Sequence, residues 1–390
     1  MRLLPFEYAV RNLGRSPTRL LLSIGGSALV VLLVLAAGAF VRGMDLSLRA
    51  TGDANNVIVL GAGSEESIER SEVESGVASV LAASVPGIRG RAGVVYVSPE
   101  VHVQLPLKVR AEQPKGPLVM VRGVTPTALL VHSAVQIAEG RFPAAGADEV
   151  MVGTMTATKM GVPASELAIG RPLLIDNRAW TIVGRFVAPG TVTEAEVWTP
   201  LPDIKAATKR DTDSCVIVTL DPEEAEFADV DAFTKMRVDL ELSAMRELDY
   251  YGKLAEFFAP VRIVAWVTAG LIGLGGLFGG LNTMYAAFAS RVRELGTLQS
   301  FGFRRGAIVV SLVQESLLAT ATGALIAAAV GVFLLDGLAV RFSMGAFGLV
   351  VDEVVIGVCL LAGLALGLFG ALPPAWRCLR MSIPVALKAV

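Results

Sequence analysis

The sequence contains few of the residues that usually build metal and catalytic sites. Its 390 residues include three cysteines, Cys215, Cys359 and Cys378, and two histidines, His102 and His132, which stand 30 positions apart. Only Cys215 falls in a stretch of soluble character, so no disulfide is expected within that stretch. Neither histidine has a cysteine or a second histidine near it in sequence. A zinc site is therefore not expected, and both histidines are predicted to be exposed or half-buried structural residues.

Several functional motifs are also missing. No Gly-x-x-x-x-Gly-Lys-Ser/Thr phosphate loop occurs, so the chain is not expected to bind ATP in the P-loop manner. Neither a Gly-x-Ser-x-Gly elbow nor a His-Glu-x-x-His motif is present. The net charge of -2, without an acidic or basic tail, indicates no nucleic-acid partner. We expect no catalytic residue, no cofactor and no metal ligand in this chain.

Apolar residues, in contrast, are abundant and concentrated. They make up 53% of the chain, and its mean hydropathy is +0.61. Four runs are long enough to cross about 30 Å of hydrocarbon at about 1.5 Å per residue. We expect membrane spans at residues 20–41, 263–290, 306–335 and 354–376, the last interrupted late by Pro373-Pro374.

The charges between these runs predict an orientation. Residues 1–19 carry four arginines against one acid, with apolar residues at helical spacing, which predicts an amphipathic helix on the inner membrane surface. The connector 291–305 carries four arginines and one glutamate, and the tail 377–390 carries three basic residues and no acid. By the positive-inside rule, these three segments and both termini lie in the cytoplasm. The loop 336–353, with three acids and one base, then lies outside.

Between the first two spans, residues 42–262 have a different character. They hold 22 Lys and Arg against 30 Asp and Glu, and they contain no run able to span a membrane. Helices are expected at Glu65–Ala83, capped by Ser64, and at Pro222–Thr234. Strands rich in valine and isoleucine are expected at Asn56–Leu60, Gly93–Leu105, Leu118–Val124, Leu173–Ile175, Ala179–Val187 and Ser214–Leu220. This pattern predicts an extracytoplasmic α+β domain with room for two lobes.

Leu242, Met245, Leu248, Tyr251 and Leu254 recur every three positions before Pro260. They predict a helical stalk at about 242–262 that leads into the second span, although an ordinary last helix of the domain would leave the same pattern. The fold class is thus an integral membrane protein of four helices, with a large extracytoplasmic α+β domain between helices 1 and 2.

Three groups of residues are candidate functional positions. The connector should contact another protein through Arg291, Arg293, Glu294, Gly296, Gly302, Arg304 and Arg305. Glycines four apart in the second span allow close helix packing, either in a dimer or within one chain: Gly275, Gly276, Gly279 and Gly280. Glu315 is an intramembrane carboxylate that either pairs with Arg304 or Arg305 or lies at the interface.

Four segments in this order resemble permease subunits of the MacB/FtsX-type ABC transporters, also called type VII or mechanotransmission transporters. They are the opening Tyr8–Arg19, the connector Arg291–Phe303, Glu315 after it, and the ending Pro374–Lys388. The resemblance covers nearly the full length, with a MacB-like periplasmic core domain at 42–262 and an FtsX-like permease domain at 263–385. Ser300, in place of the usual alanine, and Thr297-Leu298 depart from the pattern.

The resemblance implies a transport subunit of the inner membrane without its own ATP site, served by a separate ABC ATPase that docks on the connector. It implies a homodimer or a pair of related permeases. It also implies mechanical movement of the outer domain that exports or extracts a lipid, lipoprotein, peptide or drug-like cargo. A periplasmic adaptor or substrate protein is a further partner that the resemblance implies. The size of the outer domain is nearer the MacB or lipoprotein-release kind than the cell-division kind. The alternative is a signalling or scaffold protein of the same family that activates a periplasmic partner such as a cell-wall hydrolase. An enzyme with its site in the outer domain would need a constellation that the sequence does not show.

Overall fold

The computed structural model describes residues 4, 6–113, 115–343, 345–381 and 383–388. The chain forms two compact units. The helical unit consists of Met1–Arg42, Pro260–Leu338 and Leu349–Val390, and the sheet unit consists of Gly43–Ala259 with Ala339–Gly348. The predicted fold class is confirmed, because a large α+β domain lies between the first and the second of four long apolar helices.

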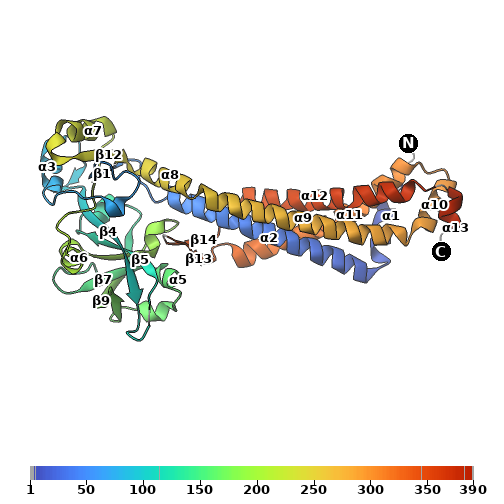
Figure 1. Ribbon diagram of the computed structural model, residues 1–390, viewed down its shortest axis with the longest axis horizontal. Helices are drawn as coiled ribbons and strands as arrows, with labels where there is room; N and C mark the ends of the chain where they lie inside the picture. The colour runs from blue at the N-terminus through green and yellow to red at the C-terminus, as the bar shows by residue number, and fades with distance from the viewer. Residues whose placement is uncertain (1–3, 5, 114, 344, 382, 389–390) are drawn as a thin grey trace. The chain divides into compact units, whose positions relative to one another are not determined.

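The four long helices have the length and composition of membrane spans and run beside one another (Figure 1). They are α2 (Pro17–Arg49), α9 (Ala259–Ala289), α11 (Arg305–Val330), which continues as one π-helical turn (Gly331–Leu335), and α12 (Glu353–Leu379). Helix α12 runs through Pro373 and Pro374, so the predicted interruption there is wrong. Neighbouring helices and local backbone adjustment allow proline in such a helix. The points at which each helix enters and leaves a bilayer stay predictions.

Small residues bring three of these helices together. A Cβ added to Gly323 of α11 would lie 2.1 Å from the Ser27 hydroxyl of α2. One added to Gly363 of α12 would lie 2.6 Å from the Cβ of Ala324 on α11. Close backbone approach through small residues is the usual way in which helices pack in lipid. The tightest contacts therefore lie between α11 and its neighbours, at glycines outside the stripe that the sequence singled out.

Short helices complete the helical unit. They are α1 (Phe6–Gly14), α10 (Val292–Ser300) and α13 (Ile383–Lys388). A buried cluster that includes Phe288, Leu295, Ile308 and Leu379 connects α9, α10, α11 and α12 at this end.

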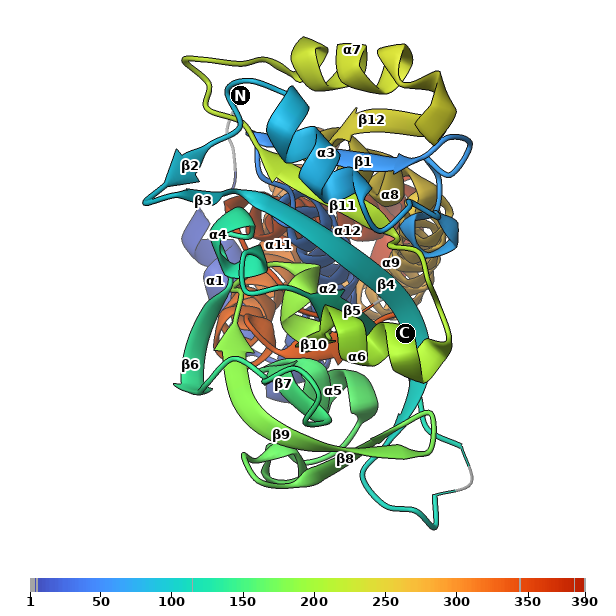
Figure 2. The same ribbon diagram turned by 90° about the vertical axis from the view of Figure 1, so that its left-hand side faces the viewer.

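The sheet unit is built on a ten-stranded sheet of mixed direction (Figure 2). The strand order is β12-β1-β11-β4-β5-β10-β7-β9-β6, and β8 pairs with β4 and β9. The strands are β1 (Asn56–Gly61), β4 (Val97–Lys108), β5 (Leu118–Val124), β6 (Gln136–Gly140), β7 (Glu149–Gly153), β8 (Pro172–Ile175), β9 (Arg178–Val187), β10 (Val197–Pro200), β11 (Cys215–Thr219) and β12 (Leu242–Arg246). The minor strands β2 (Gly90–Arg91) and β3 (Val94–Val95) form a separate hairpin.

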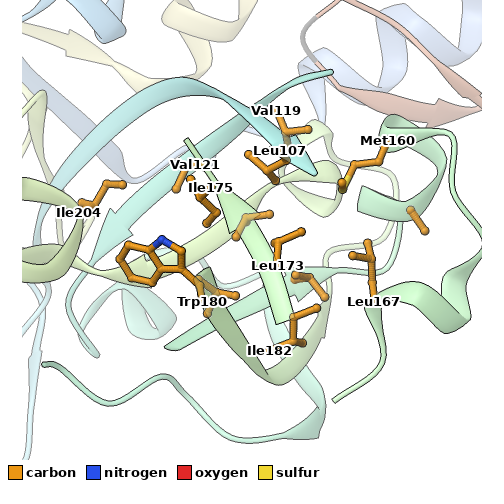
Figure 3. Close-up of a cluster of buried hydrophobic side chains, with 14 of the residues drawn as sticks. Leu107, Val119, Val121, Met160, Leu167, Leu173, Ile175, Trp180, Ile182 and Ile204 are labelled. Carbon is orange, nitrogen blue, oxygen red and sulfur yellow. The ribbon is translucent and has the colours of Figure 1, made fainter. Parts of the chain in front are cut away.

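The long strand β4 belongs to both halves of the sheet. Its first residues pair with β11, and Val101–Pro106 pair with β5. Each half has its own apolar core. One contains Val57, Leu81 and Phe233, and the other contains Leu107, Trp180 and Ile182 (Figure 3). The six predicted strands all overlap observed ones, whereas β6, β7, β10 and β12 were not predicted.

Helices cover the sheet. They are α3 (Val77–Ser84), α4 (Ala128–Val131), α5 (Thr156–Met160), α6 (Leu201–Thr208), α7 (Phe227–Met236) and α8 (Glu247–Phe257), and single 3₁₀ turns lie at Ile68–Arg70, Ala164–Leu167, Val192–Ala195 and Val238–Leu240. The predicted helix Glu65–Ala83 is wrong over most of its length. The backbone at Val73 instead pairs with Asp213 as an isolated bridge, which holds that segment extended.

The predicted helical stalk at 242–262 is also wrong in its first part. Leu242–Arg246 form strand β12, which pairs antiparallel with β1, and the helix begins only at Glu247. Backbone hydrogen bonds to a neighbouring strand outweighed a three-residue apolar spacing that also suits a helix.

A hairpin from between α11 and α12 belongs to the sheet unit. Its strands are β13 (Ala339–Arg341) and β14 (Ala346–Gly348). The Lys159 ammonium of α5 donates to the carbonyls of Phe342 and Ser343, at 2.7 Å each. The Phe342 ring also meets Phe258 edge-on, with 4.7 Å between the centroids. The hairpin that connects α11 and α12 is thus part of the sheet unit. The rest of that unit is the long segment that connects α2 and α9.

Candidate functional site

The connector between α9 and α11 is a short helix held by packing on one side. Val292, Leu295 and Gly296 of α10 are buried. A Cβ added to Gly296 would lie 2.9 Å from the Cβ of Ala386, so this glycine lets α13 pack against α10. Gly302 has φ +87°, a left-handed conformation that favours glycine, and makes the turn into α11.

Glu315 is the centre of a buried polar contact between α1, α2 and α11. Its side chain is 6% exposed. Asn12 Nδ2 donates to Glu315 Oε2 at 2.5 Å, Arg291 Nη1 donates to the same oxygen at 3.1 Å, and Arg19 donates to Oε1. The predicted pairing with Arg304 or Arg305 is wrong, because Arg305 stands ten residues earlier on α11, about 15 Å along the helix axis.

Glu294 of α10 continues this network. Tyr8 OH donates to Glu294 Oε1 at 2.6 Å, Arg15 Nη1 donates to the same oxygen at 3.0 Å, and Arg291 Nε donates to Oε2 at 3.1 Å. Arg291 thus bridges Glu294 and Glu315. We call the seven residues the coupling network; they are Tyr8, Asn12, Arg15, Arg19, Arg291, Glu294 and Glu315.

The electrostatics of the coupling network favour charged carboxylate and guanidinium groups. Burial alone would raise the pKa of Glu294, but hydrogen bonds from Tyr8 and Arg291 outweigh it and hold that pKa below its ordinary value. Burial, followed by the hydrogen bond to Glu294, raises the pKa of Tyr8. Burial would lower the pKa of Arg291, but Glu315 and Glu294 raise it. These shifts favour the charged forms of both partners in the ion pair between Arg291 and Glu294.

This arrangement changes the assignment of the candidate connector residues. Arg291 and Glu294, expected on the docking surface, are instead committed to the coupling network. Arg293, Gly302, Arg304 and Arg305 are exposed. Phe301, which the sequence did not single out, is 77% exposed. Sequence reasoning also missed Tyr8, Asn12, Arg15 and Arg19 as partners, because they stand more than 270 positions from the carboxylates that they bind.

The candidate glycines of α9 separate into two kinds. A Cβ added to Gly276 would lie 2.6 Å from a methyl carbon of Val30, so this glycine allows close approach of α2 within the chain. Gly275, Gly279 and Gly280 have open space where a Cβ would stand.

The sheet unit contains a second polar cluster, which is fully enclosed. Arg122 of β5 donates twice to Glu196, at 2.7 Å each, and once to Glu100 of β4 at 2.8 Å. His102 Nε2 and His132 Nε2 lie 2.9 and 2.7 Å from the Glu100 carboxylate. Both histidines are buried, so the expectation of exposed or half-buried rings is wrong.

Burial and neighbouring charges shift the pKa of several groups in and beside this cluster. Burial opposes charge on Glu100, but His132 and Arg122 outweigh it and hold the pKa of Glu100 well below its usual range. The Glu100 carboxylate raises the pKa of His132 against the effect of burial, whereas burial and Arg122 lower the pKa of His102. Burial raises the pKa of the Cys215 thiol well above its usual value. One histidine is thus stabilised as a cation and the other as a neutral ring.

Three of these residues have the donor atoms of a metal site. Carboxylate, imidazole and thiol atoms of Glu100, His102 and Cys215 lie within 4.8 Å of one another, because Cys215 stands opposite Glu100 across β11 and β4. The sequence does not indicate that these residues lie together, because Cys215 is more than 110 positions from Glu100 and His102. The Arg122 guanidinium binds the same Glu100 carboxylate and would repel a cation there, and the thiol is protonated. The cluster is better explained as a hydrogen-bonded core of the sheet unit.

Comparisons with known proteins give two family matches. The family model of the MacB-like periplasmic core domain matches residues 20–235, and that of the FtsX-like permease C-terminal domain matches residues 266–383. No curated protein matches the chain.

Two solved structures are similar at low identity. The periplasmic region of MacB from Actinobacillus actinomycetemcomitans has 12% identity and a TM-score of 0.40, over 54% of this chain and 95% of that one. The extracellular domain of the ABC-type transporter YknZ from Gram-positive bacteria has 12% identity and a TM-score of 0.37, over 49% of this chain and 100% of that one.

Proposed function

Because this chain belongs to the MacB/FtsX-type family of ABC transporter permeases, we propose that it couples ATP hydrolysis by a separate ATPase subunit to movement of its sheet unit. The observation that supports this most is the coupling network. It joins the connector to α2 and α11 through buried ion pairs, so a force on α10 would reach two membrane helices without a flexible link. The cargo would be a lipid, lipoprotein, peptide or drug-like molecule on the outer side of the membrane.

The exposed part of the connector is the proposed docking surface for the ATPase. Arg293, Arg304 and Arg305 offer guanidinium groups for charge-assisted hydrogen bonds, and Phe301 offers an apolar anchor between them. The chain would act as a dimer or as a pair of related permeases, since each ATPase subunit needs its own connector. Arg291 and Glu294 would transmit the force inside the permease rather than bind the ATPase.

We expect Arg293→Glu to remove the ATPase from the tagged chain in a mild-detergent pull-down analysed by mass spectrometry. The substitution reverses a charge on the docking surface and touches no buried contact, so the permease should keep its unfolding midpoint. Arg91→Glu, the same reversal on the exposed hairpin β2–β3 of the sheet unit, is the matched control and should retain the ATPase. Full recovery of the ATPase with Arg293→Glu would show that the connector is not the docking surface.

Glu294→Arg is a poor test of docking. Glu294 binds Tyr8, Arg15 and Arg291, so its loss would disturb the fold of the permease itself.

The membrane topology follows from the charge pattern and has support from the fold. The hairpin β13–β14 and residues 43–259 form one compact unit, so both connections belong on one side of the membrane. The termini and the connector would lie on the other side, which the positive-inside rule assigns to the cytoplasm.

Cysteine labelling tests this topology. Ser98 is unsuitable as a labelling position, because it is buried and bonded to Glu100. We expect a cysteine at exposed Ser79 of α3 to react with an impermeant maleimide from outside, and one at exposed Ser300 to react only after permeabilisation. A Cys378→Ala parent is the control, since Cys215 and Cys359 are buried and should stay unlabelled. The reverse labelling pattern would overturn the topology.

A signalling or scaffold role remains the second candidate. It would use the same coupling network but activate a periplasmic partner, such as a cell-wall hydrolase, instead of moving cargo.

A further inference from the structure

A polar cavity of about 660 Å³ lies beside the coupling network. It is lined by residues of α1, α2 and α9 and by the start of the connector, with three arginines, Arg15, Arg19 and Arg291, against one carboxylate, Glu294. Asn12, Asn282 and Ser290 add neutral polar groups to the same wall. A cavity with this lining is suited to an anion.

The arginines of the cavity are not fully used by the carboxylates of the coupling network. Three guanidinium groups, of Arg15, Arg19 and Arg291, meet two carboxylates, of Glu294 and Glu315, which leaves one positive charge in excess. Arg291 Nη2 is buried and has no hydrogen-bond partner among the residues that the structure describes. A buried donor without an acceptor is costly, so a ligand that supplies an anionic oxygen at this point would be favoured.

A second, mainly apolar cavity of about 280 Å³ lies between α2 and α9 and is closed behind by residues of α11 and α12. On the α9 side it is lined by Gly276, Gly279 and Gly280, and on the α2 side by residues that include Gly26 and Val30. The absent side chains of Gly279 and Gly280 leave the space open. The glycines of α9 thus have two effects. Gly276 allows close packing against α2, whereas Gly279 and Gly280 leave a groove.

The two cavities adjoin at Thr283, and we treat them together as one groove with a polar end and an apolar end. Both are lined by Thr283, and the polar Arg19 stands one helical turn before the apolar Leu22 on α2. From Arg19 to Val30 the groove follows eleven residues, or about 16 Å of helix. This is about half of the roughly 30 Å hydrocarbon thickness, so the groove matches the depth of one leaflet.

We propose that this groove binds an anionic phospholipid of the adjacent leaflet. Its phosphate would lie between Arg15, Arg19 and Arg291, and one acyl chain would enter the apolar cavity along Gly279 and Gly280. The assignment of the leaflet as cytoplasmic rests on the proposed function and its topology. Basic pockets at the ends of membrane helices on that side are suited to anionic headgroups.

Other occupants fit the groove less well. A free phosphate would satisfy Arg291 but leave the apolar cavity empty. A helix from a second copy could fill the apolar cavity, but an apolar face would leave the excess guanidinium charge unpaired. An amphipathic lipid satisfies both ends.

The test is native mass spectrometry of the purified full chain in a neutral detergent, titrated separately with phosphatidylglycerol, phosphatidylcholine of the same acyl chains, and inorganic phosphate. We expect phosphatidylglycerol to bind about fivefold tighter than phosphatidylcholine, as one unpaired basic group near a headgroup would give. Inorganic phosphate at millimolar concentration should not displace the lipid.

Two variants test the two ends of the groove, each with a matched control. Arg15→Gln should remove the preference for phosphatidylglycerol, and Arg11→Gln, on an exposed position of α1 outside the groove, should keep it. Gly279→Leu should weaken both lipids at least tenfold by filling the apolar cavity. Gly270→Leu, also in open space but on the opposite face of α9 nine positions away, should not.

Three results would overturn the proposal. Equal binding of the two lipids, unaffected by Arg15→Gln, would exclude a headgroup site. Phosphate binding that Gly279→Leu leaves unchanged, without retained lipid, would indicate a free-anion site. A chain without lipid whose dimer is broken by Gly279→Leu, and not by Gly270→Leu, would indicate a partner helix. None of these results concerns the ATPase, so the docking proposal is tested separately by Arg293→Glu.

Discussion

Replacing Glu315 with leucine should reduce transport at least tenfold and destabilise the helical unit. Glu315 is the carboxylate that contacts both Arg19 of α2 and Arg291 at the start of the connector. Without it, the largely buried Arg19 loses its counter-charge and Arg291 keeps only Glu294, and breaking a buried pair on one side costs about 3–5 kcal/mol. The cost should appear as a lower unfolding midpoint of the purified chain, and the broken link as a loss of ATP-driven cargo movement.

Two further variants make the interpretation of Glu315→Leu specific. Glu315→Gln keeps the size of the side chain and an oxygen acceptor but removes the charge. It should therefore lose less stability than Glu315→Leu, about the 1.5–3 kcal/mol of a hydrogen bond to a charged group. Gln314→Leu, at the neighbouring position of α11 and outside the coupling network, should leave both stability and transport close to those of the parent. If Glu315→Leu moved cargo at the parent rate, the coupling network would not transmit force.

We expect the largest effect in the sheet unit from Arg122→Met. Arg122 is fully buried and bonded to Glu196 and Glu100, and its loss leaves Glu196 in the core without its cation and Glu100 with only His132. The predicted loss is about 3–5 kcal/mol in the free energy of unfolding, measured on the full chain in detergent by denaturant titration. The fluorescence of Trp198, whose ring lies 5.6 Å from the Arg122 guanidinium carbon, should report the change directly.

Arg185→Met provides the matched control. Arg185 pairs with Glu139 at 3.4 Å on the surface of the same unit, and such exposed pairs contribute about 0–1 kcal/mol. Adding Glu100→Gln and Glu196→Gln to Arg122→Met should recover part of the lost stability, because the penalty comes from unpaired charge rather than from lost packing. A loss below about 1 kcal/mol in Arg122→Met itself would mean that water reaches the cluster and screens it.

The sequence predicts those features that depend on composition over long stretches. Uncharged runs of 20 or more residues and the arginines between them indicate four membrane helices and an orientation without any tertiary information. The sequence predicts the strands Leu118–Val124 and Leu173–Ile175 for a similar reason, because their aliphatic residues are bounded by turn residues.

Contacts between distant residues could not be predicted in this way. The partners of Glu315 come from α1, from α2 and from the residue before α10, and no local pattern shows which of the arginines will face it. Likewise, His102 and Cys215 meet because of the register between β4 and β11, which is set by burial across the whole sheet. The failed helix prediction at 242–246 has the same origin, since pairing with β1 determines the conformation there.

The central claim is that ATP hydrolysis on one side of the membrane moves the sheet unit on the other, and hydrogen–deuterium exchange of the permease co-purified with its ATPase tests it most directly. Exchange should be followed in β12 and α8, residues 242–257, the last part of the sheet unit before α9. Trapping the ATPase with ATP should change the exchange rate there at least threefold in the parent, and the change should vanish in Glu315→Leu. Identical exchange with and without ATP, in a preparation that hydrolyses ATP, would contradict mechanical coupling and favour a static scaffold.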